Sequence, residues 1–331
     1  MVDQKNNSEL TDAEAELYDR QIRLWGLESQ KRLRAASVLL VGLNGYGAEV
    51  AKNIILAGVK SVTFLDHRQA TTLDICSQFL IPQDQKGQNR AQASLQRAKN
   101  LNPMVEVIAD PTNIDEKSEE YFKNFDVISV TQCTIEQMKK INTICRKYNK
   151  KFFAGDVWGT FGFTFADLIT HEFAEDVVQT KKVRELEDGE PTGKEKFEKI
   201  SVTVKSFEKF VPIEKVLDAE NLPKDSEAYY LLLTLLNFRE KHKRDPLPNE
   251  RNASILKDEA EAVIKKYKLG ETINRLLKSD LYGQISPVCA IVGGVMGQEI
   301  IKTVSQKERP HNNLFVLNPH TLCGQVLRLS S

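Results

Sequence analysis

Short apolar strands alternate with helical segments along the first half of this chain, and no other feature constrains its fold as strongly. Residues 37–43, SVLLVGL, form a continuous β-branched-rich run of the kind that fills a strand buried on both faces. A glycine turn and a helical pattern at 48–58 follow, and a second such strand, SVTFLD, occupies 61–66. This alternation predicts right-handed strand–helix–strand crossovers, and hence an α/β fold with a doubly wound sheet.

The alternation continues as far as residue 157. Two more helical patterns and three more strands are predicted, at residues 89–102 and 135–149 and at residues 104–110, 126–131 and 151–157. Ahead of the first strand, Thr11 and Glu14 match a capping box, which predicts a helix that begins there and ends at Gly26. The first half of the chain therefore predicts a Rossmann-like domain preceded by a helix.

The composition changes after about residue 170. Residues 175–199 are highly charged, contain glycine and proline and lack apolar periodicity, which predicts an exposed or disordered loop. Two amphipathic segments then predict a helical insertion, and a long apolar helix and two strands close the chain; they span 227–242, 253–269, 286–306, 313–318 and 324–329. We expect three parts: a helix and Rossmann-like domain (1–170), the charged loop and helical insertion (171–283), and a helix and strands that complete the domain (284–331).

Charge balance and sequence spacing exclude several classes of function. Lys+Arg and Asp+Glu both total 46, so a binder of nucleic acid or of anionic membranes is not expected. The N-terminal segment is polar and acidic, unlike a signal peptide, and no apolar run approaches the roughly 20 residues that span a bilayer. The five cysteines lack a C-x-x-C pair and the five histidines lack metal-binding spacing. We therefore expect a soluble cytosolic or nuclear protein without a metal site.

The glycine turn predicts a nucleotide-fold ancestry. Gly42, Gly45 and Gly47 lie between a buried strand and a helix, where nucleotide-binding α/β folds hold phosphate against a helix N-terminus. Asp66 closes the next strand, about 20 residues further on, where such folds place an acid that accepts a hydrogen bond from a ribose hydroxyl. Asn44, however, stands at the position of the middle glycine, and its side chain hinders the approach of a phosphate. We interpret this as a degenerate nucleotide loop that is not used.

Three separated segments resemble the ubiquitin-like protein activating enzymes, and among them those that activate SUMO. They are YDRQIRLWG, RLRAASVLLVGLNGYGAEVAKNIILAGVKSVTFLD and SPVCAIVGGVMGQEIIKTVSQKERPHNN, at residues 18–26, 32–66 and 286–313. The resemblance implies a Rossmann-like, adenylation-type domain with a mainly helical insertion. It also implies a heterodimer with a large catalytic subunit, which adenylates the SUMO C-terminus at the expense of ATP and then forms a thioester.

The chain departs from the active members of this family at their ligand positions. Arg68 stands where the second Asp of a D-x-D motif is expected, Arg90 lies near the position of a lysine, and VTQCT offers no metal-binding aspartate. No cysteine lies between 146 and 288, so the insertion has no thioester-forming residue. The resemblance thus implies that the chain holds no cofactor of its own, and that the partner subunit binds ATP and Mg²⁺.

The resemblance also assigns a role to an arginine in the first helix. In that family the arginine of a Y-x-R-Q motif crosses the dimer interface into the partner's ATP site, and Tyr18, Arg20 and Gln21 match the motif here. A guanidinium there would stabilise charge on the departing pyrophosphate, and its planar fork can meet two phosphate oxygens. We expect Arg20 to act in trans, and Arg23 either to support it or to pair with a surface acid. The resemblance implies location in the nucleus, with the cytoplasm as a second site.

Three alternatives stay open. A self-sufficient adenylating homodimer of the kind that activates sulfur-carrier proteins is opposed by the missing phosphate and metal ligands. An NAD-dependent oxidoreductase is supported only by the glycine turn and Asp66, and Asn44 opposes it. A pure scaffold would leave Arg20 without a catalytic role.

Overall fold

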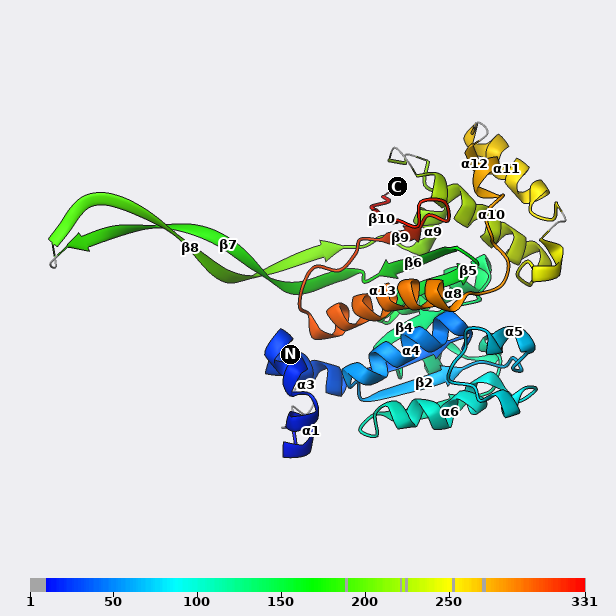
Figure 1. Ribbon diagram of the computed structural model, residues 1–331, viewed down its shortest axis with the longest axis horizontal. Coiled ribbons are helices and arrows are strands. Elements are labelled where there is room, and N and C mark those ends of the chain that lie inside the picture. Colours follow the sequence, from blue (N-terminus) through cyan, green and yellow to red (C-terminus); the bar gives the residue numbers. More distant parts are fainter. Residues whose placement is uncertain are drawn as a thin grey trace.

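The computed structural model describes residues 10–187, 190–220, 222–223, 226–251, 254–269 and 272–330 of the chain. Its centre is a sheet with the strand order β10-β9-β6-β5-β4-β1-β2-β3 (Figure 1). The parallel part consists of β1 (Ser37–Val41), β2 (Ser61–Leu65), β3 (Glu106–Asp110), β4 (Val127–Val130) and β5 (Lys151–Trp158). The antiparallel extension consists of β6 (Phe161–Asp167), β9 (Leu314–Leu317) and β10 (Gly324–Leu327). The predicted α/β, doubly wound fold class is confirmed.

Strand β1 shows why the central strands are continuously apolar. Leu39 and Val41 point into a core shared with α8 (Ile135–Lys147) and α10 (Glu227–His242). Val38 and Leu40 point into a second core, shared with α4 (Gly45–Ala57) and α13 (Ser286–Ser305). Because successive side chains of a strand point to opposite faces, a strand covered on both sides must be apolar at every position.

Helices α4, α6 (Arg90–Leu101) and α13 lie on the same side of the sheet (Figure 1). Gly293 and Gly297 of α13 meet α4 so closely that an added Cβ would lie 2.6 Å from the Cβ atoms of Glu49 and Asn53. Among the described helices, α13 is the one long and apolar enough to cross a membrane. It packs against α4 and the sheet, so its apolar character is explained by the core.

The other helices are short or belong to the insertion. The insertion contains α9 (Ile213–Leu217), α10, α11 (Lys257–Tyr267) and α12 (Thr272–Leu276). Elsewhere the chain forms α5 (Thr72–Ile75), α7 (Glu119–Phe122) and 3₁₀ turns at Gln83–Gln85, Ile114–Glu116 and Pro248–Glu250. The helices predicted at 227–242 and 253–269 are both confirmed, the second with fewer residues.

The N-terminal segment forms three short helices in place of the single predicted one. They are α1 (Asp12–Leu17), α2 (Asp19–Trp25) and α3 (Leu27–Ala35). The predicted capping box of Thr11 and Glu14 is present, and Gly26, with φ 90°, ends α2 as expected. The prediction of one continuous helix is wrong because Tyr18 ends α1 and begins α2, and its side chain is buried in the domain.

The expected loop at 175–199 is also wrong, because this region is a long antiparallel hairpin. Strands β7 (Thr170–Glu187) and β8 (Glu190–Lys209) form a two-stranded sheet that projects from the body (Figure 1), and an isolated bridge joins Ala174 of β7 to Lys307. The sequence contains the period-2 pattern of a strand at Ile200, Val202 and Val204, just beyond the charged window. The many charged residues obscured this period-2 pattern. They are compatible with a strand here because a two-stranded ribbon leaves much of its surface in solvent.

Candidate functional site

A cleft of about 500 Å³ lies at the carboxyl ends of the parallel strands. Its lining includes Asn44, Arg68, Arg90, Gln132 and Arg239. Strands β2 and β3 are added on one side of β1, and β4 and β5 on the other, so the strand order reverses at this point. Doubly wound proteins bind ligands at such a switch point, and this is where a nucleotide site would be.

The glycine turn retains its backbone shape but has no open helix N-terminus. Gly42 adopts φ 88°, and an added Cβ would lie 2.6 Å from the methyl group of Thr131. Asn44 is the N-cap of α4: its Oδ1 accepts a hydrogen bond from the Gly47 N–H at 2.8 Å, and its Nδ2 donates to Asp156 at 3.1 Å. The side chain that replaces the middle glycine thus consumes one of the N–H groups that a phosphate would use.

Other side chains fill the space next to this helix terminus. The Tyr46 N–H donates to Oε1 of Gln284 at 3.3 Å. A Cβ added to Gly45 would clash with the side chain of Ser77 and lie 3.1 Å from the same Gln284 oxygen. Side-chain oxygens of Asn44 and Gln284, together with the side chain of Ser77, therefore occupy the place where an anion would lie beside the first turn of α4.

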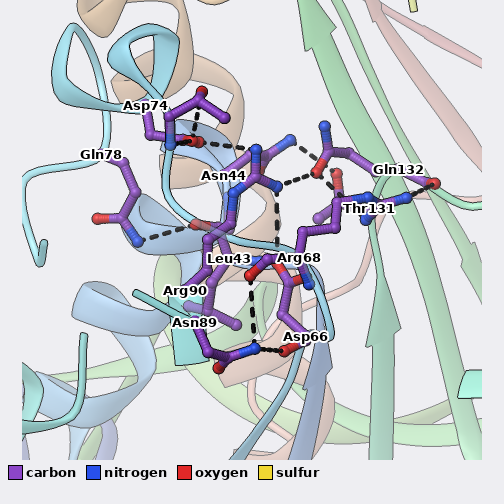
Figure 2. Close-up of polar contacts among 12 residues, drawn as sticks. Leu43, Asn44, Asp66, Arg68, Asp74, Gln78, Asn89, Arg90, Thr131 and Gln132 are labelled. Carbon is purple, nitrogen blue, oxygen red and sulfur yellow. Dashed lines mark hydrogen bonds and ion pairs between the residues drawn. The ribbon is translucent and has the colours of Figure 1, made fainter. Parts of the chain in front are cut away.

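Asp66, at the position expected to hold a ribose, is buried and bound from within the chain. Its two carboxylate oxygens accept hydrogen bonds from the N–H groups of Leu43 at 2.8 Å and Arg68 at 2.9 Å. The guanidinium of Arg90 lies 3.7 Å from the same carboxylate. Figure 2 shows Asp66 in this arrangement beneath the glycine turn, where it ties the ends of two strands together.

Two arginines of the cleft converge on Gln132. Arg90 pairs with Asp74 at 2.9 Å and donates to Oε1 of Gln132 at 2.8 Å. Arg68 donates to the backbone oxygen of Gln132 at 3.2 Å (Figure 2). The guanidinium groups of Arg68 and Arg90 are thus held by groups of the chain itself.

A buried ion pair closes the other side of the cleft. Arg239 of α10 lies 2.6 Å from Asp156 and 2.7 Å from Asp245, and it stacks on the ring of Trp158, 4.6 Å from the centroid. Burial lowers the pKa of Arg239, but the two carboxylates outweigh burial and leave that pKa above its ordinary value. Asp156 therefore already has a permanent cation as its partner. The described residues contain no group of three or more His, Cys, Asp or Glu side chains that could hold a metal ion.

Arg20 and Arg23 lie outside this cleft. Their helix α2 packs at the carboxyl end of α4, whereas the glycine turn begins α4, roughly 20 Å away for a helix of 13 residues. Arg20 is exposed and makes no ion pair or hydrogen bond with any residue that the structure describes. Arg23 pairs with Asp19 at 3.1 Å on the surface. The structure brings Gly42, Gly45, Gly47 and Asp66 together and keeps the two arginines apart from them.

The cysteines are all free thiols. Cys133 and Cys289 are buried, and burial raises the pKa of each thiol to about 12, which keeps it protonated and unreactive. Burial likewise raises the pKa of Cys145, while Cys76 and Cys323 are exposed. No described part of the insertion supplies a thiol, in agreement with the sequence.

Three residues at the cleft were not predicted from the sequence: Asp156, Arg239 and Gln284. Asp156 stands at the end of a correctly predicted strand, and strand-end acids are a recognisable signal in α/β folds. Arg239 is 83 residues further along the chain, inside an amphipathic helix, and its partner follows only from the tertiary structure. Nothing in the sequence marks Gln284 as the residue that fills the glycine turn.

Comparison with known proteins places the chain in a family. The model of the ThiF family matches residues 18–330. The SUMO-activating enzyme subunit 1 of Xenopus tropicalis is 45% identical over 346 residues, which cover 99% of each chain. Its human counterpart is 44% identical over 322 residues, 92% of each chain, and that of Danio rerio is 42% identical over 347 residues, 100% of each chain. The chain therefore belongs to the ThiF family.

Proposed function

We propose that this chain is the subunit without the catalytic cysteine in a heterodimeric SUMO-activating enzyme. It pairs with a large catalytic subunit and supports ATP-dependent adenylation of the SUMO C-terminus, before the thioester forms on the partner. The names of the relatives from Xenopus tropicalis and Homo sapiens support this assignment, since both are subunits of SUMO-activating enzymes. The complex works in the nucleus.

One observation supports the proposal that the partner subunit binds ATP while this chain supplies Arg20. Asn44, Asp66 and Arg239, in and beside the chain's own cleft, are bonded to groups of the chain itself. Arg20, in contrast, stands exposed at the far end of α4 without a partner among the described residues. An arginine roughly 20 Å from its own cleft cannot reach a phosphate there. It can reach one that a second subunit presents to α2.

Arg20 acts on the leaving group. Adenylation joins a carboxylate oxygen to the α-phosphorus of ATP and breaks the bond to the β-phosphate, so pyrophosphate leaves with the bonding electrons. A guanidinium at that position stabilises the developing charge in the transition state, as an arginine supplied in trans does for a GTPase. ATP and Mg²⁺ are bound by the partner subunit. Arg23 assists by its charge or stays paired with Asp19.

The surface around α2 has the apolar character of an interface. Leu17, Leu24 and Leu27 are 54%, 75% and 45% exposed, and they flank Arg20 along the chain. Large apolar side chains grouped on a surface mark sites of association. Leu24, the most exposed of the three, thus lies at the proposed interface.

The alternatives are opposed by the same contacts. A self-sufficient adenylating homodimer would need free phosphate and metal ligands in this cleft. An NAD-dependent oxidoreductase would need Asp66 to accept from a ribose, but that carboxylate already accepts from two backbone N–H groups.

ATP–pyrophosphate exchange driven by SUMO tests the proposal. We expect no exchange with this chain alone, exchange when the large subunit is added, and at least about a tenfold loss when Arg20→Ala replaces the wild type. Exchange by the chain alone would overturn the division of labour. An unaffected Arg20→Ala complex would leave the chain as a scaffold.

A further inference from the structure

The carboxyl end of α4 is tied to its surroundings by side chains. The last carbonyl groups of a helix lack partners within it and must find others. Here Ile55 O accepts from Nδ2 of Asn102 at 2.9 Å, and Leu56 O accepts from Nε2 of Gln21 at 3.0 Å. The next carbonyl, that of Ala57, accepts from Gln30 at 3.0 Å. Gln21 belongs to α2, so one of these bonds joins the arginine helix directly to α4.

Tyr18 provides the second anchor of α2. Its ring is 1% exposed, and its hydroxyl oxygen accepts a hydrogen bond from Nδ2 of Asn102 at 2.9 Å. The ring packs on Gly58, the left-handed C-cap of α4, where an added Cβ would lie 2.5 Å from the ring. Tyr18 and Gln21 are three residues apart and so lie on one face of the helix. Arg20, between them, is turned outward.

We infer that Gln21 and Tyr18 are positioning residues for Arg20, which fix the helix that carries it by tethering it to α4. This inference rests on the proposed role of Arg20 in trans. A helix of seven residues is too short to be stable alone, so its direction depends on such contacts. An arginine that must meet a phosphate in another subunit needs a fixed starting point, since a misplacement of about 1 Å can lower a rate 100-fold.

The choice of glutamine at position 21 supports this assignment. Its Nε2 is bonded to Leu56 O, but its Oε1 is buried without a hydrogen-bond partner. An unpaired buried oxygen destabilises the fold, and an apolar side chain of equal length would avoid it. The unpaired oxygen thus disfavours glutamine, whereas the directional bond to Leu56 O, which holds α2, favours it.

A double-mutant cycle in the full heterodimer tests the inference. Gln21→Met keeps the length and helix propensity of the side chain but removes the donor to Leu56 O. With Arg20 present, we expect Gln21→Met to lower kcat of SUMO-driven ATP–pyrophosphate exchange about three- to tenfold, the range of one lost hydrogen bond. In the Arg20→Ala background we expect Gln21→Met to change kcat less than about twofold, because its effect passes through Arg20. Tyr18→Phe, which removes only the hydroxyl, should follow the same pattern with a smaller loss.

The matched control is Gln96→Met on α6. Gln96 donates to Asn100 at 3.1 Å on an exposed helix face far along the chain from Arg20, and its replacement should leave exchange unchanged. An equal loss from Gln21→Met in both backgrounds would overturn the inference, as would a loss that a higher concentration of the large subunit restores. If Arg20→Ala alone has no effect, the proposed trans role fails instead. The two failures are therefore distinguishable.

Discussion

Replacing Arg239 with methionine removes the cation of the cleft and leaves a buried carboxylate behind. The side chains of Arg239 and Asp156 are 4% and 1% exposed, and they lie 2.6 Å apart. Breaking such a pair from one side costs about 3–5 kcal/mol, because the remaining charge is unpaired in a poorly polarisable interior. Arg239 also stacks on Trp158, which adds about 1 kcal/mol.

Neutral donors reduce this cost. Asp156 also accepts hydrogen bonds from Asn44 at 3.1 Å, from Gln284 at 3.0 Å and from two backbone N–H groups. These bonds persist in the variant and stabilise the carboxylate. We therefore expect Arg239→Met to lower the free energy of unfolding by about 3–4 kcal/mol, at or just below the lower end of the combined range of about 4–6 kcal/mol.

Urea denaturation at pH 7, followed by tryptophan fluorescence, measures this change. Asp156→Asn in the Arg239→Met background removes the stranded charge, so the double variant should recover at least about 2 kcal/mol of the loss. Asp245→Asn is the control: its carboxylate is 26% exposed and leaves Arg239 paired with Asp156, so about 1 kcal/mol is expected. A cost below about 1 kcal/mol for Arg239→Met, or additive effects in the double variant, would refute the reasoning.

Three further changes probe the glycine turn, a buried histidine and the end of α4. Asn44→Gly restores the glycine of the nucleotide pattern, but we expect calorimetry to detect no MgATP binding by the chain alone, because other side chains still fill the turn. Burial lowers the pKa of His171 to about 4, and the charge of Lys151 adds to the effect. As the pH falls below 6.5, the imidazole is therefore protonated in the unfolded chain but stays neutral in the folded one. Protonation of His171 should lower the free energy of unfolding by about 2 kcal/mol from pH 7 to pH 5. Urea titrations of His171→Phe at the two pH values should not show this decrease. Gly58→Ala would force a Cβ into the ring of Tyr18 at φ 80°, and thermal unfolding should show a loss of at least about 2 kcal/mol.

The sequence predicted those elements whose signal is local. The strand at β1 is continuously apolar because both of its faces are covered, and α10 was predicted with its observed bounds. The N-terminal helix was predicted as one piece because its helical pattern continues through residue 18. Only the burial of Tyr18 against Gly58 shows why the chain turns there, and that contact spans 40 residues of sequence. Likewise, the charges of 175–199 concealed a strand pattern that pairing in a hairpin makes clear.

The candidate site could be predicted in part for the same reason. Gly42, Asn44 and Asp66 were found because a strand–turn–helix motif fixes their spacing, and Asn44 was recognised as incompatible with a close phosphate. The groups that occupy the site instead come from distant segments. Arg239 and Gln284 contact Asp156 from positions 83 and 128 residues away. The local periodicity of a sequence does not predict contacts between such distant residues.

The same structure distinguishes the two arginines of α2. Arg23 would have to leave Asp19, an exposed pair worth about 0.2–1 kcal/mol, before it could contact a phosphate of the partner. Arg20 has no such bond to break among the described residues, and the residues that anchor its helix lie on either side of it. Helix α4 links this to the cleft: its amino end is capped from within by Asn44, and its carboxyl end holds α2. Among the described residues no anion binds Arg20, so under the proposed function its guanidinium is available to a nucleotide that a second subunit binds.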